Sequence, residues 1–167
     1  MKHLILIFLI CATSCALTAQ TSLVVKANAG VLGYYPAAAG FGTGIGLEVN
    51  AGKKLTLSVN TAFGNVQDLT DVKYSITPEV RYYFKSAFNG FYVGVNGTYD
   101  KFKPKNDLDD KFGTYLFGVG ANTGYNIVFK NNITAGLGIG ANLMGPSRND
   151  NSVNTKLVAR LEVGYKF

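Results

Sequence analysis

The sequence has 167 residues and a formal net charge of +6, with 20 glycines, 4 prolines and 13% aromatic residues. This length suits one domain, and the composition favours β structure. Both cysteines and the single histidine lie at the N-terminus, at Cys11, Cys15 and His3. A chain that loses this segment therefore has no disulfides, no Cys or His metal site and no Ser-His hydrolase site.

The N-terminus has the charged, apolar and small-residue order of a secretory signal. Its apolar run, residues 4–10, is too short to span a bilayer. We predict a signal peptide over residues 1–20, cleaved after Ala19 or Gln20, and secretion by the Sec route. A lipoprotein acylated at Cys15 is the alternative.

Residues 21–167 form the predicted domain, in which apolar and polar residues alternate with a period of two. No apolar run here approaches a membrane helix, so only strands would cross a bilayer, and most segments reach the required length of about nine to eleven residues. The predicted strands are Leu23 to Leu32, Thr43 to Asn50, Leu55 to Gly64, Lys73 to Phe84, Gly90 to Phe102, Thr114 to Val128, Ile133 to Met144 and Thr155 to Phe167.

The connections between these strands are predicted to alternate strictly between short and long. The short ones are 51–54, 85–89 and 129–132, and the long ones are 33–42, 65–72, 103–113 and 145–154. This alternation is typical of outer-membrane barrels, which have short periplasmic turns and long outer loops. The sequence thus predicts an all-β fold, a closed antiparallel eight-stranded up-and-down transmembrane β-barrel.

The two faces of the predicted strands differ in chemistry. One face is apolar, with aromatic residues gathered near both strand ends, as expected for a lipid-facing wall. The other face is polar and glycine-rich, and its opposite charges are expected to pair and plug a narrow lumen. This predicted lumen charge network consists of Lys26, Glu48, Glu79, Arg81, Lys156, Arg160 and Glu162.

Pro78 lies inside the fourth predicted strand. Proline has no N–H to donate to a strand ladder, and a closed barrel has no edge to place it on. We therefore expect a bulge or local irregularity at Pro78.

Two other charged groups are weaker candidates. Asn106, Asp107, Asp109 and Asp110 could hold Ca²⁺, but their spacing does not match an EF-hand loop and lysines are interspersed, so a solvated outer loop is the better interpretation. The short turns carry only basic charges, which face inner-leaflet phosphates or an acidic partner, or simply confer solubility. No metal, no cofactor and no nucleic-acid partner is predicted.

Three features of the sequence resemble those of a known family. They are Thr77-Pro-Glu-Val-Arg-Tyr-Tyr-Phe84, the following Gly90-Phe-Tyr-Val-Gly-Val95 and the terminal Phe167. The chain resembles the small eight-stranded outer-membrane barrel proteins of the Bacteroidetes type, an uncharacterised family. The resemblance implies insertion by the barrel-assembly machinery, which reads a C-terminal aromatic strand, and it brings no catalytic residues. In this sequence the implied assembly signal is Leu161, Val163, Tyr165 and Phe167.

We therefore expect a protein of the bacterial outer membrane that is not an enzyme. Its expected partners are outer-membrane lipids, lipopolysaccharide and a surface partner bound through the outer loops. A narrow channel for small solutes and a soluble secreted lipocalin-like binder are the alternatives. A lipid-modifying barrel enzyme ranks last because such chemistry typically uses a histidine.

Overall fold

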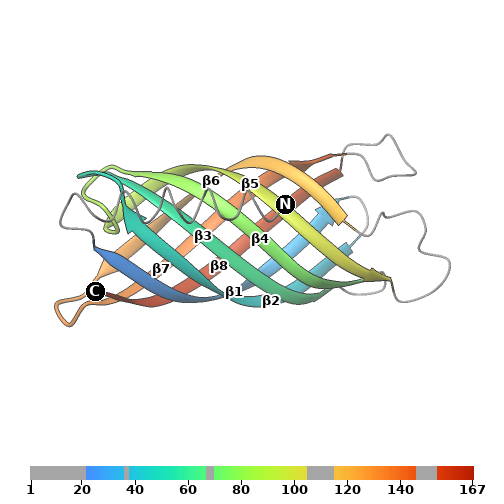
Figure 1. Ribbon diagram of the computed structural model, residues 1–167, viewed down its shortest axis with the longest axis horizontal. Helices are drawn as coiled ribbons and strands as arrows, with labels where there is room; N and C mark the ends of the chain where they lie inside the picture. The colour runs from blue at the N-terminus through green and yellow to red at the C-terminus, as the bar shows by residue number, and fades with distance from the viewer. Residues whose placement is uncertain (1–21, 36–37, 67–69, 105–114, 146–153) are drawn as a thin grey trace, which may run out of the picture.

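The computed structural model describes residues 22–35, 38–66, 70–104, 115–145 and 154–167 (Figure 1). Within them, consecutive antiparallel strands pair in order and β8 pairs with β1, so the sheet closes into a barrel of eight strands. This confirms the predicted fold class. The strands are β1 (Leu23–Tyr35), β2 (Ala38–Asn50), β3 (Leu55–Val66), β4 (Thr70–Tyr83), β5 (Gly90–Pro104), β6 (Tyr115–Val128), β7 (Ile133–Met144) and β8 (Asn154–Lys166).

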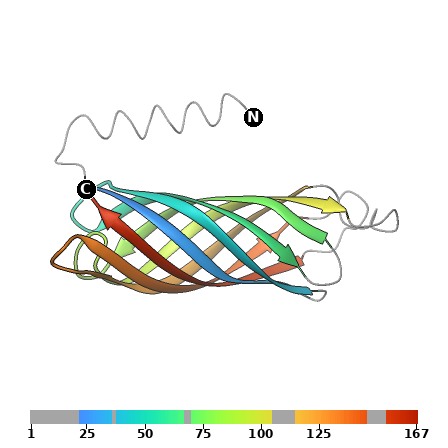
Figure 2. The ribbon, with the colours of Figure 1, turned by 90° about the horizontal axis from the view of Figure 1, so that it is seen from below.

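The barrel has two distinct ends. The start of β1, the end of β8 and the β2–β3, β4–β5 and β6–β7 turns lie together at what we call the turn end (Figures 1 and 2). The opposite end is the loop end. The predicted signal peptide, residues 1–20, lies outside the described residues.

The strict alternation of short and long connections is wrong. Only two residues separate β1 from β2, and three separate β3 from β4, where the sequence predicts loops over 33–42 and 65–72. Glycines and alanines of the first segment continue the ladder instead, with Gly33 paired to Ala39 and Leu32 to Gly40. Glycine is common in turns, so the sequence predicts a loop over this segment. In a strand, glycine instead marks places where neighbouring backbones approach closely. The connections after β5 and β7 remain long.

The expected disturbance at Pro78 is a local irregularity of the ladder and not a bulge. The β4–β5 ladder lacks pairs at Thr77 and Pro78 but resumes in the same register at Glu79. The register shifts earlier in β4, between Val72 and Tyr74, and the ladder to β3 shifts at the same level. The β4–β5 ladder therefore accommodates the missing proline N–H by leaving two residues unpaired. The extra residue of β4 that shifts the register lies nearer the loop end.

The outer wall is apolar along its length. Val119 on β6, Ile139 on β7 and Leu161 on β8 are 68%, 61% and 65% exposed. In each strand, such outward-facing residues alternate with residues that point inward. This is the period-two arrangement expected of a lipid-facing barrel. No helix among the described residues combines the length and apolar character needed to cross a membrane.

Aromatic rings mark both rims of this wall. Near the loop end, the rings of Tyr99 and Phe117 lie 4.8 Å apart between centroids. At the turn end, Phe84 contacts Phe91 at 5.5 Å and Tyr165 contacts Phe167 at 4.9 Å. Such bands are typical of residues at membrane interfaces, where amphipathic rings are favoured.

Candidate functional site

The candidate site is the barrel lumen, which has three layers along its axis. A network of ion pairs fills the turn-end half, a small cavity lies in the middle, and an apolar cluster lies at the loop end. Inward-facing positions of all eight strands build these layers, because alternate residues of each strand point into the barrel.

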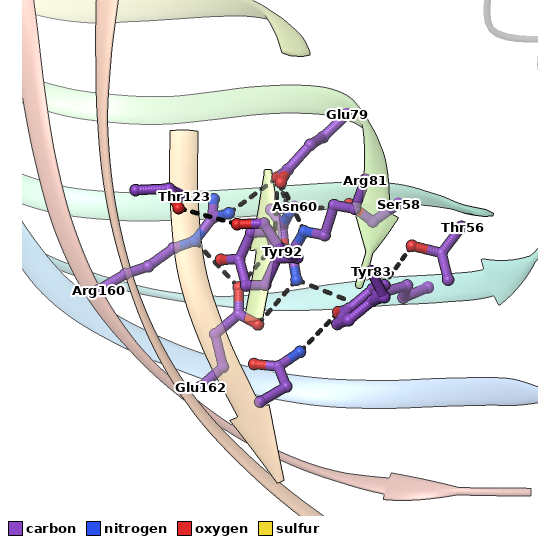
Figure 3. A network of polar contacts seen from close by, with 12 residues as sticks. Thr56, Ser58, Asn60, Glu79, Arg81, Tyr83, Tyr92, Thr123, Arg160 and Glu162 are labelled. Atoms are coloured by element: carbon purple, nitrogen blue, oxygen red, sulfur yellow. Dashed lines mark hydrogen bonds and ion pairs between the residues drawn. The ribbon is translucent and has the colours of Figure 1, made fainter. Parts of the chain in front are cut away.

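Arg81 on β4 is the centre of the network and is fully buried. Its Nε lies 2.5 Å from Glu79 Oε1, its Nη1 3.1 Å from Glu48 Oε2 and its Nη2 2.9 Å from Glu162 Oε1. The three carboxylates come from β4, β2 and β8. One guanidinium thus links opposite walls of the barrel, and Figure 3 shows Arg81, Glu79 and Glu162 converging beside Tyr92.

Two further cations complete the network. Lys26 Nζ pairs with Glu48 and lies 2.9 Å from Glu162 Oε2. Arg160 Nη2 lies 2.8 Å from Glu79 Oε2, and its Nε lies 3.0 Å from Glu162 Oε1. We call Lys26, Glu48, Glu79, Arg81, Arg160 and Glu162 the charge network. Its three cations balance its three carboxylates, which is the condition under which buried charges are tolerated.

Neutral side chains satisfy the remaining oxygens. Thr56 Oγ1 and Tyr83 Oη donate to Glu48 Oε1 over 2.6 and 2.9 Å, and Asn126 Nδ2 donates to Tyr83 Oη over 2.7 Å. Arg81 Cζ stands 4.6 Å from the centroid of the Tyr92 ring. Tyr83 and Tyr92 were not among the predicted lumen residues, because aromatic residues were expected on the outer wall. Both fall on the inward face by the same alternation, which was the available signal.

Lys156, which was predicted to belong to the lumen charge network, pairs with a residue outside it. Its Nζ lies 2.8 Å from Asp100 Oδ2 and 3.3 Å from Ser75 Oγ. Lys156 precedes Arg160 by four residues on β8, which corresponds to roughly 13 Å along a strand. The predicted residue is therefore buried in the lumen and ion-paired, but towards the loop end. Asp100, which is also inward-facing, was missed.

A cavity of about 50 Å³ lies between the charge network and the loop end. Glycines of β1, β2 and β7 line it, and Arg160 and Lys156 border it. Five asparagines from five strands also line it: Asn28, Asn60, Asn96, Asn122 and Asn142. We call this space the central cavity.

The loop-end layer is apolar. Leu32, Val72, Phe102, Leu116 and Met144 form one buried cluster, with Val158 packed against it. We call it the apolar cluster. Its side chains come from β1, β4, β5, β6 and β7, with Val158 from β8, so they converge across the lumen from much of the wall.

Ion pairs and hydrogen bonds hold the charged side chains of the lumen in place. Each carboxylate of the charge network accepts hydrogen bonds from at least two donors. In the described part of the chain, no three His, Cys, Asp or Glu side chains gather as a metal site would require. The segment with Asp107, Asp109 and Asp110 lies outside the described residues.

Comparison with known proteins agrees with this architecture. The model of a family described as "Protein of unknown function (DUF3575)" matches residues 5–151. No curated protein matches the sequence.

Three solved structures share the fold. Neisserial surface protein A has a TM-score of 0.66 and 20% identity, over 89% of this chain and 98% of that chain. The N-terminal barrel domain of Pseudomonas aeruginosa OprF gives 0.56 and 16%, over 86% and 97%. The outer membrane protein OprG from the same organism gives 0.54 and 13%, over 89% and 96%.

Proposed function

The chain belongs to the DUF3575 family, and we propose that it is an integral protein of the bacterial outer membrane with a structural or surface-interaction role. The apolar outer wall and its two aromatic rims support this location, because a soluble protein rarely exposes so large a contiguous apolar surface. The similar fold of OprG, whose structure is described as that of an outer membrane protein, is consistent with it. The Pro-Glu-Val-Arg-Tyr element of β4 supports a Bacteroidetes-type origin.

The observation that carries the proposed role is the position of Arg81. Its guanidinium bridges carboxylates on β2, β4 and β8, so it crosses the space that a pore would need. Tyr83 and Tyr92 are fully buried beside it, and the apolar cluster adds a second obstruction towards the loop end. An eight-stranded barrel has an interior that side chains can fill. The lumen is therefore a plugged core and not a standing channel.

The contacts of such a protein would be made at its loop end. The connections after β5 and β7 are the long ones, and we propose that they meet lipopolysaccharide or a surface partner. Insertion by the barrel-assembly machinery is part of the same proposal. We propose no catalytic role, since each buried lumen carboxylate in the described part of the chain is paired with a cation.

Conductance of the purified protein in planar lipid bilayers tests the plugged lumen. We expect no steady current at moderate voltage, with a general porin in the same bilayer as a control for sensitivity. A reproducible, steady single-channel current would overturn the structural role and support the narrow channel for small solutes. The specific observation that favours this second candidate is the central cavity, which already provides open space lined by asparagines in mid-lumen.

A further inference from the structure

We propose that the central cavity is a binding site for a small uncharged molecule that carries both hydrogen-bond donors and acceptors. This inference concerns the middle layer of the lumen and does not depend on the role proposed for the whole protein. It follows from unpartnered polar atoms, from the charge balance of the cavity walls and from the size of the space.

Two asparagines on the cavity wall lack the partners that burial demands. Asn122 on β6 is 8% exposed, and neither its Nδ2 nor its Oδ1 has a hydrogen-bond partner. Asn142 on β7 is 3% exposed, and its Oδ1 has no partner. A buried polar atom left unpaired costs about 1–3 kcal/mol. An occupant of the cavity would remove this penalty.

The unpartnered atoms around the cavity are a mixture of donors and acceptors. The free donors are Nδ2 of Asn28 and Asn122. The free acceptors are Oδ1 of Asn96, Asn122 and Asn142. An anion would find only the donors useful, and a cation only the acceptors. A neutral amide, a small polyol or water satisfies both.

The charged groups at the border do not change this preference. Arg160 is engaged by Glu79 and Glu162, and Lys156 is engaged by Asp100. Their charges are therefore compensated within the wall. The cavity offers hydrogen bonds without a net charge to attract an ion.

The size of the cavity limits the occupant. A water molecule, which has one non-hydrogen atom, needs about 10–15 Å³ of cavity volume. The central cavity, with about 50 Å³, therefore holds about four non-hydrogen atoms. Glycines keep this room open: a Cβ on Gly138 would lie 2.5 Å from Tyr92 Oη and 3.6 Å from Arg160 Nε. Tyr92 Oη is itself unpartnered and adds a hydroxyl group beside the cavity.

Acetamide, which has four non-hydrogen atoms, is the probe for a solute. The full-length protein, ¹⁵N-labelled and folded in detergent micelles, is titrated with acetamide while side-chain amide resonances are recorded by NMR. We expect saturable shifts at Asn122 and Asn142. In Asn122→Leu, which removes both free amide atoms, the dissociation constant read from the Asn142 shifts should rise at least tenfold. The shifts of both asparagines should be unchanged in Thr134→Val, a buried change outside the cavity lining.

Water is the other source of the same chemistry. If acetamide causes no shift but long-lived water gives cross-relaxation peaks to both asparagine amides, the proposal holds with water as the occupant. It is overturned if neither probe is detected at these amides, or if Asn122→Leu responds to acetamide like the original protein. Electrophoretic mobility with and without heating reports folding, and Asn142→Leu replaces Asn122→Leu if that variant does not fold.

Discussion

At the scale of residues, Arg81 shows why a guanidinium stands at the centre of the charge network. Its planar group presents five N–H donors in a fixed fork, so it can engage Glu48, Glu79 and Glu162 at once. A lysine has three donors on one atom and would not reach three walls of the lumen. Arg81 is the one member of the charge network that contacts all three of its carboxylates, and Arg160 adds a second link between β8 and β4 through Glu79.

Replacing Arg81 with leucine should be strongly destabilising. The variant leaves three buried carboxylates facing two cations, so one negative charge is uncompensated. Breaking a buried ion pair in this way costs about 3–5 kcal/mol. Urea unfolding in lipid vesicles, followed by circular dichroism, measures the loss.

Lys130→Ala provides the control for Arg81→Leu. Lys130 is exposed in the β6–β7 turn, and its replacement should change stability by no more than about 0.5 kcal/mol. Equal stability of the two variants would show that the charge network does not stabilise the barrel.

At the scale of elements, neighbouring strands approach so closely that some positions exclude a side chain. A Cβ on Gly44 in β2 would lie 1.8 Å from the carbonyl oxygen of Thr61 in β3. At Gly97 in β5, the nearest atoms to such a Cβ are 3.9 Å away. Glycines of similar appearance in the sequence therefore have different structural requirements.

Gly44→Ala should impair folding, whereas Gly97→Ala should be tolerated. The first substitution forces β2 and β3 apart, and overpacking of this kind costs about 1–3 kcal/mol. The fraction of protein that shows heat-modifiable mobility after refolding into detergent measures the effect. If both variants refold to the same extent, the close approach at Gly44 is not a constraint.

The two faces of β8 provide a further prediction. We propose that Leu161, Val163, Tyr165 and Phe167, on the outer face, act as the assembly signal. Phe167→Ala should then reduce the amount of protein in the outer membrane several-fold. Arg160→Ala, on the lumen face of the same strand, should alter lumen packing while insertion survives. Normal assembly of Phe167→Ala, measured by membrane fractionation, would remove the role proposed for this aromatic residue.

At the scale of the whole molecule, the barrel is apolar outside and mainly polar inside. A lipocalin-like binder has the opposite arrangement, with an apolar interior that holds its ligand. If this chain were a soluble protein, its apolar outer wall would face water. That exposure costs about 25 cal/mol of free energy for each Å² of apolar surface. This reversal is the main argument against a soluble secreted protein.

From the apolar outer wall we predict how the protein partitions between cell fractions. It should stay with the membranes after an alkaline carbonate wash and should be extracted only by detergent. A periplasmic binding protein in the same cells controls for release of soluble material. Recovery of the folded protein in the detergent-free soluble fraction would contradict the membrane assignment and favour the lipocalin-like alternative.

The period-two alternation by itself determined the all-β class and the face on which most side chains lie. It placed Glu79 and Arg81 two residues apart on one face, where they pair. Alternation is a local property, since each side chain is directed by its own strand. The sequence therefore predicted the outer wall and most of the charged lumen residues, but not Asp100, Tyr83 or Tyr92.

Only the tertiary structure decided which lumen residues lie at the same level. That depends on strand register, which joins residues far apart in the chain, such as Lys26 with Glu162 and Lys156 with Asp100. It also showed that residues 38–42 extend β2 and that Pro78 needs no bulge. The central cavity arises from the same register, because it gathers glycines and asparagines from separate strands at one height of the barrel.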